Sequence, residues 1–171
     1  LGMQAHVTVL DRDIDKLRAA DRIYQGHLQT VTSNAYEVER AVLDADLVIG
    51  AGVSGMNAAA IALGMQAHVT VLDRDIDKLR AADRIYQGHL QTVASNAYEV
   101  ERAVLDADLV IGAVLVPGAK APTLVSNELV AQMKPGSVLV DIAVDQGGCF
   151  ESSRPTTHSD PTFAVAGSVF Y

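Results

Sequence analysis

The chain carries the run Val48-Ile49-Gly50-Ala51-Gly52-Val53-Ser54-Gly55, in which an apolar stretch passes through a Gly-x-Gly-x-x-Gly turn. A helix of small residues is expected next, over Val53–Leu63, followed by a strand, Ala67–Asp73, that ends on an acid. This order of strand, glycine turn, helix, strand and acid is typical of a dinucleotide-binding unit. The sequence therefore predicts an α/β fold with a doubly wound parallel sheet of the Rossmann type.

Each glycine of the turn has its own expected role. Gly50 permits the tight turn, Gly52 lets the backbone approach a pyrophosphate, and Gly55 lets the helix pack against the strand. The free N–H groups and positive end of the helix would hold the phosphates. Asp73 would accept hydrogen bonds from the adenosine ribose and repel a 2′-phosphate, which favours NAD over NADP. The alternative is a glycine-rich helix start that serves close packing alone.

The composition limits the partners and the compartment. A formal charge of −8 argues against nucleic acid or an anionic membrane as a partner. Cys149 is the only cysteine, so an internal disulfide is impossible and a reducing compartment is favoured. The sequence shows no signal peptide and no apolar run of membrane-spanning length. These features predict a soluble cytoplasmic protein.

A nearly perfect internal repeat divides the chain. Residues 1–51 recur as 63–113, and Thr32 against Ala94 is the single difference. A recent duplication, an engineered joining or an error of sequence assembly would each give such identity. Two copies do not make a solenoid array.

The junction between the copies predicts which strand becomes the first. Val48–Ala51 recurs as Val110–Ala113, and strands one and four of a doubly wound domain can both carry this sequence. We therefore expect Leu47–Gly50 to serve as strand one, at the centre of the sheet. Strand two should come from the second copy, because helix one joins it by a normal right-handed crossover.

The repeat implies two unequal parts. Residues 1–46 form a duplicated partial βαβα segment without a glycine turn, and residues 47–171 form the dinucleotide-binding domain. Asp11 matches Asp73, but no phosphate cradle precedes it, so the first part should bind nothing. It either adds to a sheet edge or a second chain, or stays partly disordered.

The remaining elements follow from periodicity and caps. Asp75 or Asp77 should cap the second helix, and Ser95 or Asn96 the third. The expected segments are helix Ile76–Tyr86, strand Leu90–Val93, helix Ala97–Leu105, strand Asp108–Val116, helix Asn127–Met133, strand Ser137–Ile142 and strand Thr162–Val165.

Residues 47–171 resemble the NAD-binding domain of alanine dehydrogenase, within the alanine dehydrogenase and transhydrogenase superfamily. The resemblance rests on three blocks in order, which are Val48–Asp73, Ile111–Pro122 and Met133–Cys149, continued by Ser153–Thr157 and Pro161–Phe163. The nucleotide-binding subunit of transhydrogenase usually lacks an aspartate at the position of Asp145. The dehydrogenase is therefore favoured over a transhydrogenase module.

The resemblance implies a site, residue by residue. The pyrophosphate would contact the glycine turn, namely Gly50, Ala51, Gly52, Val53, Ser54 and Gly55. Asp73 would bind the adenosine ribose, with Lys78 and Ser95 near the adenosine end. The residues that would line the nicotinamide side are Val114, Leu115 and Ile142. Asp145 matches an aspartate implicated in the chemistry. No metal site is expected.

The family's reaction is the reversible oxidative deamination of L-alanine to pyruvate and ammonia, with hydride passing to NAD. The family's catalytic His and its substrate-binding Lys and Arg belong to another domain, which precedes the region covered here. We therefore expect this chain to bind NAD(H) without turning over alanine by itself. The intact family forms homo-oligomers. A non-functional product of recombination is the remaining alternative.

Overall fold

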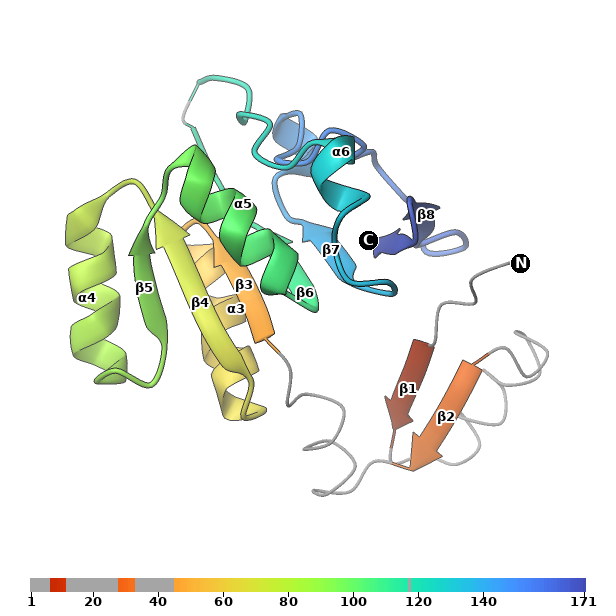
Figure 1. Cartoon of the computed structure of the whole chain (residues 1–171), viewed down its shortest axis with the longest axis horizontal. Coiled ribbons are helices and arrows are strands. Elements are labelled where there is room, and N and C mark those ends of the chain that lie inside the picture. The colour runs from red at the N-terminus through yellow and green to blue at the C-terminus, as the bar shows by residue number, and fades with distance from the viewer. Residues whose placement is uncertain (1–6, 12–27, 33–44, 117) are drawn as a thin grey trace.

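The computed structural model describes residues 7–11, 28–32, 45–116 and 118–171. Within them, two strands form a small sheet of their own and seven strands form the main sheet (Figure 1). The main sheet has the order β5-β4-β3-β6-β7-β9-β8. Its strands are β3 Ala45–Ile49, β4 His68–Asp73, β5 Gln91–Ala94, β6 Leu109–Gly112, β7 Val138–Asp141, β8 Phe163–Val165 and β9 Ser168–Phe170. All neighbours pair in parallel except β8 and β9, which confirms the predicted Rossmann-type sheet.

The strand before the glycine turn lies at the centre of the sheet, as the junction between the copies predicts. β3 pairs with β4 on one side and with β6 on the other. Its last residue, Ile49, lies opposite both Leu72 and Gly112. The strand beside β3 thus comes from the second copy, also as predicted. The identical segments Ala45–Gly50 and Ala107–Gly112 supply two adjacent strands, because a run of small and branched apolar residues suits either buried position.

The helices cover both faces of the main sheet. Two helices, α3 (Val53–Gly64) and α4 (Ile76–Tyr86), share a core with Val48 and Val71. Across the sheet, α5 (Ala97–Asp106) and α6 (Asn127–Val130) pack on a second core that includes Leu47 and Ile49. The alternation of Leu47, Val48 and Ile49 between the two cores follows from the period of two in a strand. Figure 1 shows α3 behind β3 and α5 in front of the sheet.

At two helix N-termini the structure shows which of the two predicted residues is the cap. Asp75 caps α4 by accepting from the backbone N–H groups of Asp77 and Lys78. Asn96 caps α5 by accepting from Glu99 N–H. Ser95 instead donates its backbone N–H to the Asp73 carbonyl, so it continues the edge of the sheet rather than opening the helix.

Two of the predicted elements are clearly shorter than expected, and one strand was not predicted. The strand expected over Asp108–Val116 ends at Gly112, and the chain then crosses the glycine turn. The helix expected over Asn127–Met133 ends at Val130, and the chain continues in tighter turns, in which the N–H groups of Gln132 and Met133 donate to the carbonyls three residues before them. The short strand β9 was not predicted. It follows a tight turn in which Ala166 (φ 49°) and Gly167 (φ 92°) have positive φ, as two-residue hairpins require.

Among the residues that the structure describes, the two strands of the first copy pair only with each other. β1 (Val7–Asp11) and β2 (Leu28–Thr32) are parallel, and Asp11 lies opposite Thr32. The corresponding pair of the second copy, Asp73 opposite Ala94, has the same register. These strands do not extend the edge of the main sheet. The helices expected in the first copy lie outside the described residues.

Candidate functional site: a cleft at the carboxyl ends of the central strands

A cleft of about 380 Å³ opens where β3, β4 and β6 end. This is the point at which the chain leaves neighbouring strands toward opposite faces, where open α/β sheets bind their ligands. The cleft brings together seven predicted site residues, which are Gly50, Gly52, Asp73, Lys78, Ser95, Val114 and Leu115. It also includes residues that the sequence analysis did not assign to the site, namely Ile49, Leu72, Arg74, Ala113, Val116, Pro122 and Leu124. Five of them are sequence neighbours of predicted residues, whereas Pro122 and Leu124 come from the segment after β6.

The three glycines of the turn occupy three different environments. Gly50 has φ +115°, and a Cβ atom there would lie 2.6 Å from the Ala113 carbonyl oxygen. A Cβ atom on Gly55 would collide with the Gly50 carbonyl oxygen and come within 3.2 Å of Val48. A Cβ atom on Gly52 would meet nothing within 4 Å. The first and third glycines are therefore required by packing, whereas the second borders open space in the cleft.

The first turn of α3 presents backbone donors to this space. Gly52 is the N-cap and supplies no capping side chain, and its carbonyl accepts a hydrogen bond from Met56 N–H in the first helical turn. Val53 is 83% exposed and Ser54 is also exposed, so both lie at the open end of the helix. An uncapped helix start with a glycine and no acidic side chain in its first turn suits an anionic group.

Asp73 ties the end of β4 to the glycine turn. Its Oδ2 accepts a 2.7 Å hydrogen bond from the backbone N–H of Ala51, and its Oδ1 accepts one of 2.8 Å from Asp75 N–H. Lys78 Nζ lies 3.8 Å from Oδ2 and is half exposed, whereas the Asp73 side chain is only 13% exposed. The carboxylate therefore has a fixed orientation at the cleft wall, with a mobile cation beside it.

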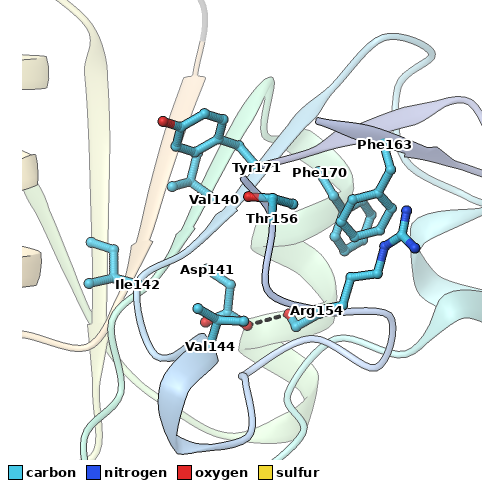
Figure 2. A pocket seen from close by; sticks show the side chains of 10 residues that line it. Val140, Asp141, Ile142, Val144, Arg154, Thr156, Phe163, Phe170 and Tyr171 are labelled. Carbon is cyan, nitrogen blue, oxygen red and sulfur yellow. Dashed lines mark hydrogen bonds between the residues drawn. The ribbon is translucent and has the colours of Figure 1, made fainter. Parts of the chain in front are cut away.

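A second pocket, of about 220 Å³, adjoins the end of β7. Ile142, predicted to face the nicotinamide, lines this pocket rather than the cleft, and it is 45% exposed. Figure 2 shows Ile142 on one side of Asp141 and Arg154 on the other, beside Phe163. Arg154 lies 4.2 Å from the centre of the Phe163 ring, a cation–π contact. Phe163 in turn stacks on Phe170.

Asp145, the predicted catalytic residue, lies apart from both pockets. It is in a short 3-10 helix, Val144–Gln146, which follows β7, and its side chain is exposed. The structure therefore places it in the loop after Ile142 but does not bring it into the lining of the cleft. Two further predicted residues do not line the cleft, because Ala51 is buried and Gly55 packs against the Gly50 carbonyl.

No group of three or more His, Cys, Asp or Glu side chains in the described residues is placed to hold a metal ion. No helix in the same part of the chain has the length and apolar character needed to cross a membrane.

The sheet order and the cleft together define a class, the nucleotide-binding domains of the Rossmann type. The model of the family "Alanine dehydrogenase/PNT, C-terminal domain" matches residues 1–51 and again residues 47–171. The chain belongs to this family, and the double match follows the internal repeat.

Curated relatives agree with the family match. Over 125 residues, the chain is 69% identical to an alanine dehydrogenase of Mycobacterium tuberculosis (strain CDC 1551 / Oshkosh) and 63% identical to one of Mycolicibacterium smegmatis. Each alignment covers 73% of this chain and 34% of the relative. The chain thus spans about a third of the length of these relatives.

Solved structures agree as well. An L-alanine dehydrogenase superposes with a TM-score of 0.73 at 28% identity, covering 98% of this chain and 64% of that one. A transhydrogenase from Sinorhizobium meliloti superposes with a TM-score of 0.64 at 21% identity, covering 97% of this chain and 65% of that one. The second likeness shows the shared fold alone.

Proposed function

We propose that this chain binds NAD(H) in the cleft and is the coenzyme-binding part of an L-alanine dehydrogenase. The observation that carries the proposal is the Asp73–Ala51 hydrogen bond beside the open side of Gly52. Around the cleft, this arrangement places the Asp73 carboxylate, the backbone at Gly52, which no side chain covers, and the N-terminus of α3. Those are the three groups that a ribose and a pyrophosphate need.

Different residues would contact different parts of the coenzyme. The glycine turn and the first turn of α3, from Gly50 to Gly55, would hold the pyrophosphate. Asp73 would accept from the adenosine ribose, with Lys78 and Ser95 beside it. Val114 and Leu115, at the exit of β6, and Ile142, at the exit of β7, would face the nicotinamide. The apolar character of these three side chains suits a flat ring.

Selectivity for NAD over NADP would come from charge. A 2′-phosphate would approach the Asp73 carboxylate, whose position is fixed by two backbone donors. Arg74 and Lys78 line the same cleft and would attract a phosphate. Asp73 is the least exposed of the three and cannot turn away, so we expect its repulsion to decide against NADP.

The reaction proposed for the intact protein is the NAD-dependent conversion of L-alanine and water to pyruvate and ammonia. The bound nicotinamide supplies hydride acceptance. Asp145 would act close to the reacting carbon, where a carboxylate can orient water and stabilise developing positive charge. The family's proton-transferring His and substrate-binding Lys and Arg match no residue of the sequence given. We therefore expect coenzyme binding without alanine turnover from this sequence alone.

The wider setting of the protein also follows from the family resemblance. Homo-oligomers and a cytoplasmic location are expected, and the substrates L-alanine and pyruvate become partners only when the rest of the protein is present. Neither nucleic acid nor a membrane is expected as a partner.

The deciding experiment is a fluorescence titration of the purified chain with NADH, with NADPH in parallel. Saturable NADH binding with much weaker NADPH binding supports the proposal. Absence of binding by both would overturn it and leave the family membership as ancestry alone. The Gly52→Ala variant is the matched control, because the added methyl group meets open space in the protein but occupies the proposed pyrophosphate position.

A further inference from the structure

Asp141 is a buried acid that the proposed coenzyme contacts do not use. It is the last residue of β7 and is only 9% exposed. None of the ion pairs among the described residues involves its carboxylate. Four donors surround it instead, three from the backbone and one from a side chain. Such complete satisfaction is what a buried carboxylate requires.

The four donors come from the two ends of one loop. Oδ1 accepts from Ala143 N–H at 3.0 Å, just before the turn that carries Asp145. Oδ2 accepts from Cys149 N–H at 2.7 Å and from Phe150 N–H at 3.3 Å, just after that turn. Ser153 Oγ also donates to Oδ2, the bond drawn as a dashed line in Figure 2. The carboxylate therefore closes the loop by binding both of its ends.

The closing bond also sets the backbone of the loop. Gly148 has φ +76°, and a Cβ atom there would lie 2.5 Å from Ser153 Cβ and 2.9 Å from Asp141 Oδ2. Only glycine allows the chain to pass this close to the carboxylate. The backbone at Gly148 is thus shaped around Asp141, whereas a Cβ atom on the preceding Gly147 would meet the Lys120 side chain.

The closed loop packs beneath the nicotinamide side of the proposed cleft. A Cβ atom on Gly112 would lie 2.9 Å from the Phe150 ring and 3.1 Å from Cys149 Cβ, so these two residues lie directly against the end of β6. The Leu124 N–H donates to the Cys149 carbonyl at 2.7 Å. Val114 and Leu115 follow one residue beyond Gly112, the last residue of β6. Asp141 is therefore linked to both sides of the nicotinamide position, Ile142 with Asp145 on one side and Val114 on the other.

We propose that Asp141 is a positioning residue, whose carboxylate holds the loop of residues 142–153 so that Ile142 and Asp145 are set for the nicotinamide end of the coenzyme. The proposal rests on the proposed NAD(H) function for its ligand, but the order of the loop can be measured without any ligand. Asp141→Asn keeps the size of the side chain and replaces one acceptor oxygen with a donor that faces donors. The adenosine end of the cleft, formed by β3, β4 and α3, is left untouched.

The first readout compares two ligands. ADP-ribose contains the adenosine, ribose and pyrophosphate groups but no nicotinamide, whereas NADH contains all of them. In Asp141→Asn we expect NADH affinity to fall about tenfold and ADP-ribose affinity to stay within about twofold, the scale of a lost charged hydrogen bond at one end of the site. A general loss of structure would weaken both ligands equally and would overturn the proposal, as would an unchanged NADH affinity.

The second readout needs no ligand. Cys149 is the only cysteine and its side chain is fully buried, so a disulfide reagent reports the opening of this loop alone. We expect the thiol of Asp141→Asn to react at least about tenfold faster than that of the wild type, while the thermal transition stays cooperative. An unchanged rate contradicts the proposal. Asp160→Asn, an exposed acid beyond the loop, is the matched control and should react like the wild type.

Ser153→Ala provides a milder variant should Asp141→Asn fail to fold. It removes one of the four donors, so its thiol should react about two to five times faster than that of the wild type. If wild-type protein bound no NADH, the proposed function would fall, and the thiol rates of the two variants would still decide the role of Asp141.

Discussion

The Asp73 carboxylate accepts a 2.7 Å hydrogen bond from the backbone N–H of Ala51, across 22 positions of sequence. One acid thus fixes the turn that would hold the pyrophosphate while it faces the side where the ribose would lie. The donor is a backbone N–H group, so a side-chain substitution at Ala51 would not remove it. Loss of the Asp73 charge should therefore act on coenzyme binding through both the ribose contact and the shape of the turn.

We expect Asp73→Asn to lower NADH affinity about tenfold and to reduce the difference between the affinities for NADH and for NADPH. An amide still accepts one backbone bond but no longer repels a 2′-phosphate. The measurement is a pair of fluorescence titrations for each variant. The repeat supplies the control in Asp11→Asn, which makes the same change in the same local sequence where no glycine turn precedes it. Equal effects of the two substitutions would contradict the assignment.

Gly52→Ala and Gly55→Ala should separate binding from folding. A methyl group on Gly52 meets nothing within 4 Å and φ is −80°, so unfolding free energy should change by no more than about 1 kcal/mol while NADH binding is lost. A methyl group on Gly55 collides with the Gly50 carbonyl, so the domain should lose about 2–4 kcal/mol. Urea unfolding and NADH titration of both variants test this. Retention of NADH affinity by Gly52→Ala would count against the pyrophosphate position.

The main sheet was predictable because its signals are local. The glycine turn, the period-two core of β3 and the caps Asp75 and Asn96 each depend on residues close in sequence. The central place of β3 followed from a sequence shared with β6, together with the handedness of crossovers. Hairpin strand β9 escaped prediction because three residues carry no periodic pattern.

Most of the predicted site residues line the cleft, Val114 and Leu115 among them, but Ile142 and Asp145 do not. Gly50, Gly52 and Asp73 belong to one strand–turn–helix–strand motif, so their meeting follows from local sequence, whereas Lys78 was implied by the family resemblance. Asp141 gave no signal of its own, since an acid that ends an apolar strand resembles a turn residue. Its role depends on donors that return to it 8 to 12 positions later through a glycine pair of positive φ. Such a contact is set by tertiary folding rather than by local sequence.

Removal of residues 1–44 should leave NADH affinity within about twofold of the value for the whole chain. The two described core clusters contain no residue before Leu47, and β1 and β2 belong to a separate sheet. The first copy has no glycine turn before Asp11 and so no second site to lose. Calorimetric titration of both forms would give affinity and stoichiometry together. A stoichiometry of two in the whole chain would contradict the expectation of one site.

Burial of Cys149 should make stability depend on pH above neutrality. Burial, with the nearby Asp141 carboxylate, raises the pKa of the thiol from its ordinary value of 9.0 to about 11. The unfolded chain loses this proton near pH 9 but the folded chain keeps it, so the stabilisation is present below pH 9 and is lost as pH rises to about 11. We expect the unfolding free energy to fall by roughly 1–3 kcal/mol across that window on this account.

Cys149→Ala isolates this contribution, since the tyrosines and lysines that also titrate there are common to both proteins. The variant should be less stable than the wild type near neutral pH, because removing the fully buried Cys149 sulfur leaves a cavity in the core. Its stability should then decline less steeply between about pH 9 and pH 11, so that the two curves converge. Urea unfolding at several pH values gives both curves. Parallel curves would mean that the folded protein does not hold the thiol proton, and that the loop closed by Asp141 admits water at high pH.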